Sequence, residues 1–323
     1  MKYALSFRLA TAVTALSLTL AGCGGVKSDA GSATPAASGA KGTVKLAVNP
    51  WVGYEANAAV VAYLLEKKLG YTVEKKNLKE EISWQGFETG EVDAILENWG
   101  HDDLKKTYIE DKKVAVEVGP TGNKGVIGWY VPQWVADKYP DITDWKNLNK
   151  YADLFKTSES KGKGQMLDGD PSFVTNDKAL VSNLKLNYEV VFSGSEAALI
   201  KAAQQATAQQ KPLLFYFYEP QWLFSREKYV RVKLPTYTTG CDADPKKVAC
   251  DYPDYTLDKI ASKKFADTGG AAYQLIKNFQ WTNDDQNLVS DYITNQGMSA
   301  DAAAEKWVNE HESTWKAWIP AAG

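Results

Sequence analysis

The sequence is unusually rich in the aromatic residues Trp and Tyr. Its 323 residues include 11 Trp and 17 Tyr, but only 3 Met and 2 His. Trp51 and Trp99 lie just past the ends of two predicted strands, which is where open α/β sheets bind ligands. Because tryptophan is also mostly buried in proteins, packing is the alternative role for both residues. We expect both side chains to contact a ligand.

Motifs for common enzymatic chemistry do not occur in the sequence. It has no Gly-rich phosphate loop, nucleophile elbow or HExxH run. The adjacent carboxylates Glu80-Glu81 and Asp102-Asp103 are better explained by solvent exposure than by acid–base catalysis. Two His and three Cys leave little material for a metal site. We predict a binding protein with no catalytic residues, metal or cofactor, and a hydrolase is the alternative.

Composition and charge exclude further classes. The chain has 37 Lys and Arg against 40 Asp and Glu, for a net charge of -3. A nucleic-acid binder normally carries a basic patch and a high isoelectric point, so we expect no nucleic-acid partner. With 44% hydrophobic and 24% charged residues, the composition is that of a globular protein. The length suits two domains, each with its own hydrophobic core.

The N-terminus has the features of an export signal. Lys2 and Arg8 begin the chain, and the apolar stretch Leu9–Leu20 is too short and too near the terminus for a membrane span. The sequence Leu-Ala-Gly-Cys-Gly around Cys23 resembles a bacterial lipobox, in which the Cys is lipidated and becomes the mature N-terminus. We predict a signal peptide over residues 1–22 and lipidation of Cys23. An ordinary signal peptide with an incidental Cys is the alternative.

The residues that follow Cys23 have the composition of a tether. They are rich in Gly, Ala and Ser and poor in large apolar residues, so they cannot bury enough surface to fold. We predict that residues 23–42 comprise the lipidated Cys and a flexible linker. The folded domain is then exported and anchored by lipid to the outer face of the cell membrane.

Cys241 and Cys250 flank a polar loop that contains a turn signal. In the oxidising compartment that export implies, this spacing favours a local disulfide between them. A metal-binding pair is the alternative, but other metal ligands are not found nearby in the sequence.

Strand and helix patterns alternate along the body of the chain. We predict strands over residues 43–48, 71–76, 92–96, 125–131 and 213–218, and helices over 54–68, 83–90, 134–139, 145–155, 177–184 and 195–209. Ser195 can cap the last of these helices. A helical region over residues 271–317 contains or adjoins four tryptophans, which we interpret as packing residues. This alternation predicts an α/β chain with mainly parallel sheets.

Four segments resemble one known family in their order and spacing. They are Asn49-Pro50-Trp51, Gly90-Glu-Val-Asp-Ala-Ile-Leu-Glu-Asn-Trp99, Ser193-Gly-Ser-Glu-Ala-Ala198 and Lys211-Pro-Leu-Leu-Phe-Tyr-Phe-Tyr-Glu-Pro-Gln-Trp222. Together they resemble the quaternary-ammonium substrate-binding proteins of ABC transporters, which are receptors for glycine betaine, choline and carnitine. The resemblance covers about residues 43–318.

This resemblance implies a fold and a partner. The fold is the two-lobed α/β fold of type II periplasmic binding proteins, with a ligand cleft between lobes that two crossing strands join. We expect lobe one to comprise residues 43–131 plus 235–323, and lobe two residues 132–234. The implied function is to bind a small quaternary ammonium compound and deliver it to an ABC permease. Glycine betaine is the first candidate, choline or carnitine the next, and another small solute is the alternative.

The resemblance also implies a cage for the cation. Electron-rich rings hold a trimethylammonium group by cation–π attraction and apolar contact, each worth about 0.5–2 kcal/mol. Trp51 and Trp99 match aromatic residues of the family, and Tyr218 falls where the family has a Trp before Pro. Phe173 falls on the loop that presents a third Trp in glycine betaine receptors. Tyr216 points to the same face of its strand as Tyr218, so one of the two can belong to the core.

Other residues are implied at the polar end of the ligand. The backbone N–H groups of Val174 and Thr175 correspond to those that hold the ligand carboxylate in the family. His101 resembles a His that contacts this carboxylate, with a shorter spacing from the preceding Trp. Asp170 either caps its loop or contacts a ligand hydroxyl. Glu219 is either solvated or paired with an Arg, or it faces the cleft, where it would repel a betaine carboxylate and favour a ligand with a hydroxyl group or a second cation.

Overall fold

The computed structural model describes residues 41–173 and 175–321. The predicted signal peptide, Cys23 and nearly all of the predicted linker lie outside the described residues, and so does Val174. All helices and strands below belong to one compact unit, Gly39–Gly323.

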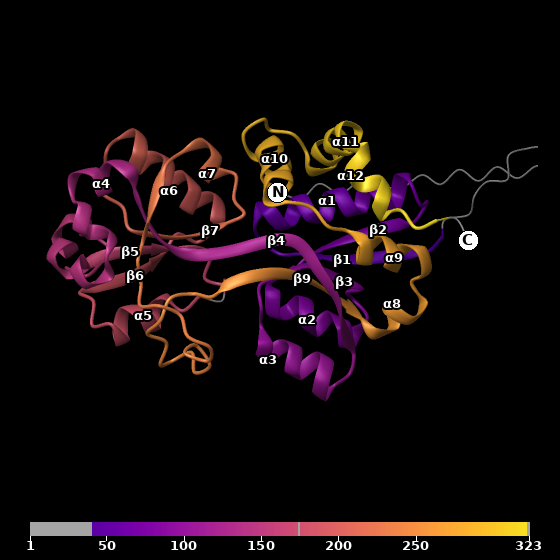
Figure 1. The fold of residues 1–323 in the computed structure, drawn as a ribbon, viewed down its shortest axis with the longest axis horizontal. Helices are drawn as coiled ribbons and strands as arrows, with labels where there is room; N and C mark the ends of the chain where they lie inside the picture. Colours follow the sequence, from indigo (N-terminus) through magenta and orange to yellow (C-terminus); the bar gives the residue numbers. More distant parts are fainter. Residues whose placement is uncertain (1–40, 174, 322–323) are drawn as a thin grey trace, which may run out of the picture. The chain divides into compact units, whose positions relative to one another are not determined.

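The described strands form one mixed sheet in the order β2-β1-β3-β9-β4-β7-β5-β6, with β8 paired to β4. Their bounds are β1 Thr43–Val48, β2 Thr72–Asn77, β3 Ala94–Asn98, β4 Ala115–Pro132, β5 Gly164–Asp168, β6 Tyr188–Phe192, β7 Phe215–Glu219, β8 Tyr229–Val232 and β9 Asp254–Ser262. Figure 1 shows β1, β2 and β3 in one lobe and β5, β6 and β7 in the other. The expected two-lobed α/β fold is therefore confirmed.

Helices cover both lobes. In the first lobe they are α1 Val52–Lys67, α2 Glu80–Thr89, α3 Asp102–Lys105, α8 Lys263–Thr268, α9 Gly270–Asn278, α10 Asn283–Thr294, α11 Ala300–Glu310 and α12 Glu312–Trp315. In the second lobe they are α4 Gln133–Lys138, α5 Asp177–Asn183, α6 Glu196–Ala208 and α7 Leu223–Arg226. A 3-10 helix replaces the α-helix expected over Trp145–Phe155. The predicted cap of α6 is confirmed, since the Ser195 side chain accepts a hydrogen bond from the Ala198 N–H.

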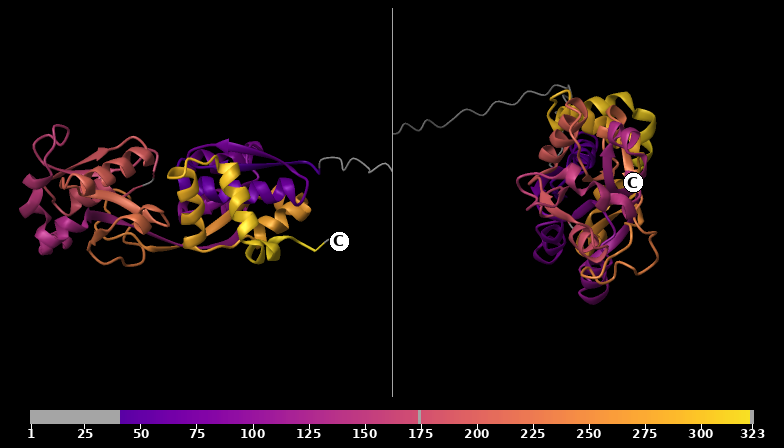
Figure 2. Two further views of the ribbon diagram at one scale, coloured as in Figure 1. Left: turned by 90° about the horizontal axis from the view of Figure 1, so that it is seen from above. Right: turned by 90° about the vertical axis from the view of Figure 1, so that its left-hand side faces the viewer.

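Two strands, β4 and β9, run between the lobes (Figures 1 and 2). β4 is 18 residues long. From Ala115 to Val126 it pairs with β9, and from Val126 to Pro132 it pairs with β7 and β8. One continuous strand therefore contributes to the sheets of both lobes.

The expectation of mainly parallel sheets was wrong. Pairings at the two outer parts of the sheet are parallel, namely β1 with β2 and β3, and β5 with β6 and β7. The pairings around β4 and β9 are antiparallel. The reason is topological, because β4 leaves the first lobe and β9 returns to it, so these neighbouring strands run in opposite directions.

The core of the first lobe is built around α1 and a group of C-terminal aromatic residues. Most of α1 is buried, and it packs against α10 and α11. Trp307 stacks on Trp318 at 5.8 Å between ring centroids and meets Trp281 edge-on at 5.4 Å. Trp315 is also buried, and its Nε1–H donates to the Val308 carbonyl. The packing role expected for these four tryptophans is confirmed.

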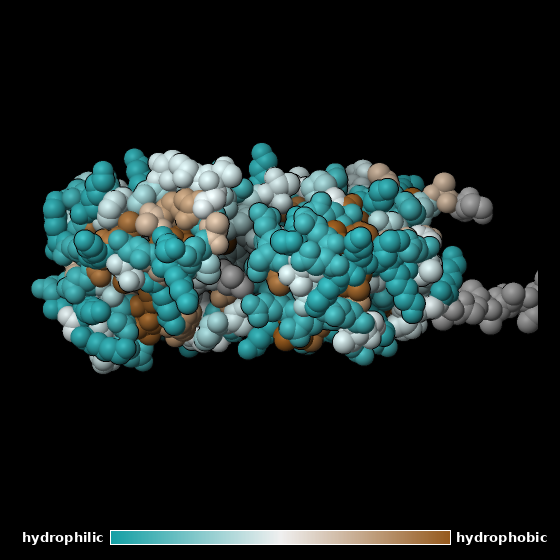
Figure 3. Space-filling view, turned by 90° about the horizontal axis from the view of Figure 1, so that it is seen from below, coloured by the Kyte–Doolittle hydropathy of each residue, from teal (hydrophilic) through white to brown (hydrophobic). Residues whose placement is uncertain are grey.

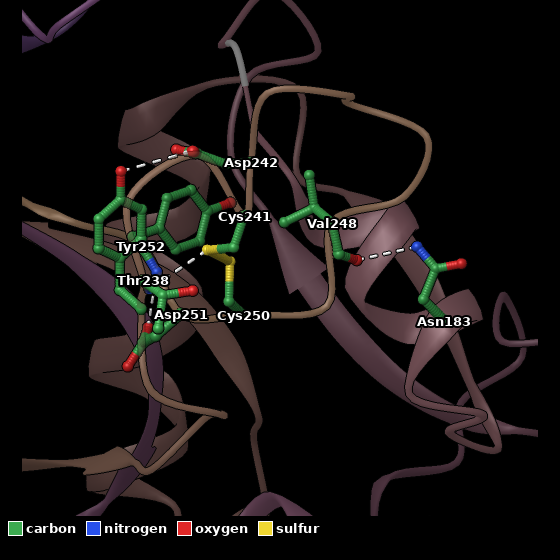
Figure 4. Close-up of a disulfide and its surroundings, with 9 residues drawn as sticks. Asn183, Thr238, Cys241, Asp242, Val248, Cys250, Asp251 and Tyr252 are labelled. Carbon is green, nitrogen blue, oxygen red and sulfur yellow. Dashed lines mark hydrogen bonds between the residues drawn. A yellow bond between two sulfur atoms is a disulfide. The ribbon is translucent and has the colours of Figure 1, made fainter.

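A disulfide joins Cys241 to Cys250 in the segment between β8 and β9 (Figure 4). The loop that it closes packs against the second lobe, since Asn183 Nδ2 of α5 donates to the Val248 carbonyl at 2.9 Å. Just after the loop, the Tyr252 hydroxyl accepts a hydrogen bond from the Asn176 N–H at 2.7 Å. The segment before β9 therefore contacts the second lobe.

Hydrophilic side chains cover most of the face shown in Figure 3, and hydrophobic ones form separate small patches. Ile82 is the single large hydrophobic side chain that is exposed among the described residues, at 43%. No helix in residues 41–173 and 175–321 is long and apolar enough to cross a membrane. The aromatic excess of the sequence is thus located in the interior.

Gly122 provides a test of the way β4 packs on the first lobe. Its φ of +92° is a left-handed conformation, and a Cβ there would lie 2.4 Å from the Trp281 carbonyl oxygen. We expect Gly122→Ala to lower the free energy of unfolding by more than about 1 kcal/mol, because it adds a clash to backbone strain. Gly119→Ala is the matched control, with a φ of +111° and open space around the added Cβ. Equal losses of stability in urea titrations of the two variants would contradict this packing.

Candidate functional site

A small cavity, partly open to solvent, lies where residues of the two lobes meet. Both lobes and both crossing strands contribute to its lining. The described residues that line it are Trp51, Glu80, Trp99, His101, Ile127, Phe173, Tyr216, Tyr218 and Tyr255.

The ends of strands position most of these side chains. Trp51 follows β1 and precedes the first turn of α1, and Trp99 follows β3 directly. Tyr216 and Tyr218 project from one face of β7, as expected for alternate residues of a strand. Ile127 on β4 lies opposite Tyr218 in the sheet, so the register of β4 and β7 sets the floor of the cavity.

Six aromatic rings form a continuous wall. Phe173 meets Trp51 edge-on at 5.7 Å between centroids and lies 6.5 Å from Tyr216. Tyr216 is 6.2 Å from Tyr218, and Tyr218 meets Trp99 edge-on at 5.6 Å. Trp99 is also 5.6 Å from Tyr255. Such edge-to-face contacts fix the orientation of each ring through its neighbours.

Glu97 holds the two tryptophans from behind. Its Oε1 accepts hydrogen bonds from the indole Nε1–H groups of Trp51 and Trp99, each at 2.8 Å. Its Oε2 accepts from the side-chain amides of Asn57 and Gln286, the latter at 3.0 Å. Burial raises the pKa of Glu97 to about 7, although these hydrogen bonds favour the ionised form.

Glu196 has a similar position behind Tyr218. Its carboxylate accepts hydrogen bonds from the Tyr218 hydroxyl and from Gln221 Nε2, the latter at 2.6 Å. It also accepts from the backbone N–H of Val52 in the first lobe at 2.8 Å. Burial raises the pKa of Glu196 to about 7. This carboxylate therefore links a wall of the cavity in one lobe to the start of α1 in the other.

His101 reaches the cavity through a tight turn. Gly100 and His101 have consecutive positive φ values of 92° and 53°, which turn the chain back after Trp99. The imidazole Nε2 lies 2.9 Å from Glu80 Oε1. Burial lowers the pKa of His101, but the hydrogen bond and the charge of Glu80 outweigh burial, so this pKa is raised. The imidazole is thus held toward its protonated form, with both ring nitrogens able to donate.

The loop after β5 delivers Phe173 to the cavity. Asp170 shapes this loop, because its Oδ1 accepts from the Ser172 N–H and hydroxyl at 2.7 Å. The Thr175 hydroxyl donates to Asp168 Oδ2 at 3.0 Å. A Cβ on Gly169 would lie 2.8 Å from the Phe173 ring, so this position must remain glycine for the ring to lie where it does.

Two buried carboxyl groups support the second lobe beneath the rings. Asp177 Oδ1 accepts from Trp129 Nε1 at 2.6 Å and from the Tyr252 hydroxyl at 3.0 Å. Burial, and then the charge of Asp168, raise the pKa of Asp177 well above its ordinary value. Burial also raises the pKa of Asp168. The two groups therefore favour a state in which they share a proton.

The structure brings most of the expected site residues together. Trp51, Trp99, His101, Phe173 and Tyr218 all line the cavity. Asp170 does not line the cavity, because it lies on a neighbouring hollow. Its side chain caps its own loop, which is the first of the two roles considered for it.

Thr175 and Glu219 are not among the lining residues. Thr175 belongs to the same loop as Phe173 but does not line the cavity, and Val174 lies outside the described residues. Glu219 also lies away from it and is half-buried beside Arg231, whose charge lowers the pKa of Glu219 against the larger effect of burial.

Three lining residues were missed, together with the carboxylate behind the two tryptophans. Glu80, Ile127, Tyr255 and Glu97 were not expected at the site, and Tyr216 was left between core and site. Glu97 could have been found, because a charged residue stands inside the otherwise apolar strand pattern before Trp99. Tyr255 carries no such signal, because only the pairing of β9 with β3 and β4 brings it to the cavity.

The arrangement can hold a soft cation of small size. The wall offers ring faces, and no Lys or Arg is among the described lining residues. The described part of the chain also has no cluster of His, Cys, Asp and Glu that could hold a metal ion.

Comparisons with known proteins agree with this chemistry. Residues 42–310 match the family described as the substrate binding domain of ABC-type glycine betaine transport system. The trimethylamine N-oxide-binding protein of Pelagibacter ubique is 23% identical over 317 residues, which cover 95% of this chain and 98% of that protein. The glycine betaine/proline betaine-binding periplasmic protein of Salmonella typhimurium is 25% identical over 279 residues, with 79% and 83% covered.

Solved structures share the fold. Lactococcal OpuAC in its closed conformation with glycine betaine superposes with a TM-score of 0.68 at 22% identity, covering 86% of this chain and 99% of that chain. An ABC-transporter choline-binding protein with choline also gives a TM-score of 0.68, at 20% identity over 85% and 91% of the two chains. The expected type II periplasmic-binding-protein fold is confirmed by these similarities.

The Asp168–Asp177 pair predicts a pH dependence of stability. A carboxyl group with a raised folded-state pKa stabilises the fold below its ordinary value of 3.8, and this contribution is lost as the pH rises through the raised pKa. Asp177→Asn cannot ionise and keeps an acceptor for Trp129 and a donor toward Asp168. We expect the free energy of unfolding to fall less between pH 4 and pH 8 in this variant than in the wild type. Parallel curves from urea titrations across this range would rule out the shared proton.

Proposed function

The chain belongs to the family of substrate-binding domains of ABC-type glycine betaine transport systems, and we propose that its ligand is glycine betaine or a closely similar quaternary ammonium compound. The chain is a solute-binding receptor of such a system. We propose that the cation binds in the aromatic cavity and that the loaded protein delivers it to an ABC permease.

The continuous aromatic wall is the observation that carries this proposal. A trimethylammonium group has no hydrogen bond to donate and spreads its charge over its methyl groups. It therefore gains most from contact with several ring faces at once, at about 0.5–2 kcal/mol for each ring. A primary amine would lose hydrogen bonds to water that this wall does not replace.

The polar end of the ligand is proposed to meet His101 and the loop that carries Phe173. The imidazole is held by Glu80 through Nε2, so its other N–H can donate to an oxygen of the ligand. The backbone N–H groups of Val174 and Thr175 stay proposed partners of the same oxygen.

An oxygen acceptor is common to the ligands that the relatives' names state. These ligands are trimethylamine N-oxide in one relative, glycine betaine and proline betaine in another, and choline in a solved structure. Choline and trimethylamine N-oxide are therefore the alternatives to glycine betaine for this chain.

We propose that the lobes close on the ligand. We assign residues 43–131 and the chain from β9 onward to lobe one, and residues 132–253 to lobe two. The expected boundary at residue 235 is moved because the disulfide loop contacts α5. Contacts across the lobes, such as the bidentate pair of Arg226 with Asp291 and the hydrogen bond from Val52 to Glu196, belong to the closed state.

The location of the protein is proposed from its relatives and its N-terminus. One relative is named as a periplasmic protein. We propose that this chain is likewise extracytoplasmic, and that a lipid on Cys23 anchors it to the outer face of the membrane.

A titration panel tests the ligand. Isothermal calorimetry with glycine betaine, choline, carnitine and trimethylamine N-oxide should give the tightest binding for glycine betaine. Glycine betaine and choline should each bind at least about tenfold more tightly than their unmethylated analogues glycine and ethanolamine, because contacts of the methyl groups with several rings together are worth about 1.4 kcal/mol or more. Equal binding of glycine and glycine betaine would show that the rings are not the recognition device.

A ring deletion tests the cage. Trp99→Ala should weaken binding of the preferred panel ligand by about 1–3 kcal/mol, because it removes one ring face and opens the cavity to water. Trp145→Leu is the matched control, since Trp145 is half-buried in the second lobe and does not line the cavity. An affinity that changes equally in both variants would place the ligand elsewhere.

Removal of Cys23 tests the anchor. Cys23→Ala should release the protein from the membrane fraction, while its calorimetric affinity for the panel ligand should not change. Mass spectrometry of the wild-type protein should find a lipid on an N-terminal Cys23. Membrane retention that survives the substitution would contradict lipidation at this residue.

A further inference from the structure

Glu97 is an acidic residue in the interior of the first lobe. It is the fourth residue of β3 and is 1% exposed. In the described part of the chain, no Lys, Arg or His forms an ion pair with it. Its partners are neutral N–H donors only. A buried carboxylate without a cationic partner is costly, so its presence calls for a compensating role.

The two indole rings connect Glu97 to the cavity. One oxygen, Oε1, accepts both indole N–H groups, so Trp51 and Trp99 converge on a single atom. Asn57 and Gln286 occupy the other oxygen and prevent rotation of the carboxylate. Both indoles line the cavity, and their N–H edges turn toward the anion.

This arrangement does more than orient the rings. An indole whose N–H donates to an anion is polarised, and its ring becomes more negative. In a low-dielectric interior the carboxylate also attracts a cation that lies against the rings it holds. Both effects increase with the charge of the ligand and vanish for a neutral ligand of the same shape.

We propose that Glu97 is the counter-ion of the bound ammonium group, positioning Trp51 and Trp99 and supplying through them the negative charge that neutralises the ligand. This inference rests on the proposed function. It assigns to Glu97 a selectivity for charge, whereas the rings alone select for shape and apolar surface.

The protonation state of Glu97 gives the inference a measurable signature. Burial raises the pKa of Glu97 to about 7, so the empty site holds a proton in part of the molecules near neutral pH. A cation in the cavity stabilises the ionised form, so binding should release that proton. Affinity for a cation should therefore fall as the pH decreases below 7.

Other titratable groups face the same region and must be separated from Glu97. They are Tyr54 of α1, Glu80 of α2, His101, Glu196 of α6, Tyr218 of β7 and Tyr255 of β9. The pKa of Glu196 is also raised to about 7 by burial, and that of His101 is raised by Glu80 against burial. These groups are present in both Glu97→Gln and the wild type. The difference between the two proteins in the pH dependence of affinity therefore reports on Glu97.

The experiment compares charged ligands with neutral-headed ligands of the same shape. Glycine betaine is paired with 3,3-dimethylbutanoate, and choline with 3,3-dimethylbutan-1-ol, in which carbon replaces the ammonium nitrogen. We expect Glu97→Gln to weaken binding of the ammonium ligands about tenfold or more, and to change binding of the carbon analogues less than about threefold. Calorimetry in two buffers of different ionisation enthalpy measures the protons released on binding. At pH 7, Glu97→Gln should release about half a proton less per bound choline than the wild type.

Two further measurements secure the result. The double variant Glu97→Gln/Gln286→Glu moves the carboxylate to the neighbouring side chain, and it should restore part of the preference for the ammonium ligand. In the wild type, the preference for choline over its carbon analogue should decrease between pH 8 and pH 5.5. If Glu97→Gln does not fold, the wild-type pH series still tests the inference, because an unchanged preference would overturn it.

The outcomes separate the inference from the proposed function. Equal losses for the ammonium ligand and its carbon analogue would overturn the counter-ion role and leave Glu97 as a structural residue. A wild-type preference that does not change with pH would overturn it as well. If the wild type binds no ammonium compound of the panel, the proposed function fails and the inference fails with it.

Discussion

The hydrogen bonds between β4 and β9 are the interaction on which the site depends. These strands join the two lobes, and the rings of the cavity are placed by their registers. β9 places Tyr255 opposite Gly125 of β4, and the absence of a side chain at Gly125 leaves room for the Trp99 ring, which a Cβ would approach to 2.5 Å. Two residues further along β4, Ile127 lies opposite Tyr218 of β7. A slip of the register would therefore displace walls of the cavity in both lobes.

Carboxylates without cationic partners recur behind the rings. Glu97 lies behind the two tryptophans, Glu196 behind Tyr218, and the Asp168–Asp177 pair behind the tyrosines of the second lobe. Trp, Tyr or amide groups donate hydrogen bonds to oxygens of Glu97, Glu196 and Asp177. The rings that face the cavity are thus oriented by their polar edges, while their apolar faces stay available. Such a shell both fixes the geometry and makes the interior electrostatically negative.

The fold and about half of the site could be predicted from the sequence, for physical reasons that particular residues illustrate. Trp51 and Trp99 follow strands with clear apolar patterns, so local signals place them at the carboxyl ends of β1 and β3. Tyr255 could not be found in this way, because β9 alternates polar and apolar residues and reaches the site only through long-range pairing. The same dependence on long-range pairing explains why the antiparallel centre of the sheet was missed. Asp170 has a local explanation in its own turn, and the sequence alone could not separate this role from ligand contact.

The outermost strand of the first lobe, β2, has a consequence for association between copies of the protein at high concentration. An open strand edge can pair with the edge of a neighbouring copy and start intermolecular association. β2 has the sequence Thr-Val-Glu-Lys-Lys-Asn, and its charged side chains Glu74, Lys75 and Lys76 project from that edge region, with Lys75 paired to Asp301 and Lys76 to Glu74. Extending the sheet would bury these charges against those of a second copy. Crowded molecules of this protein should therefore stay separate while their cavities remain accessible.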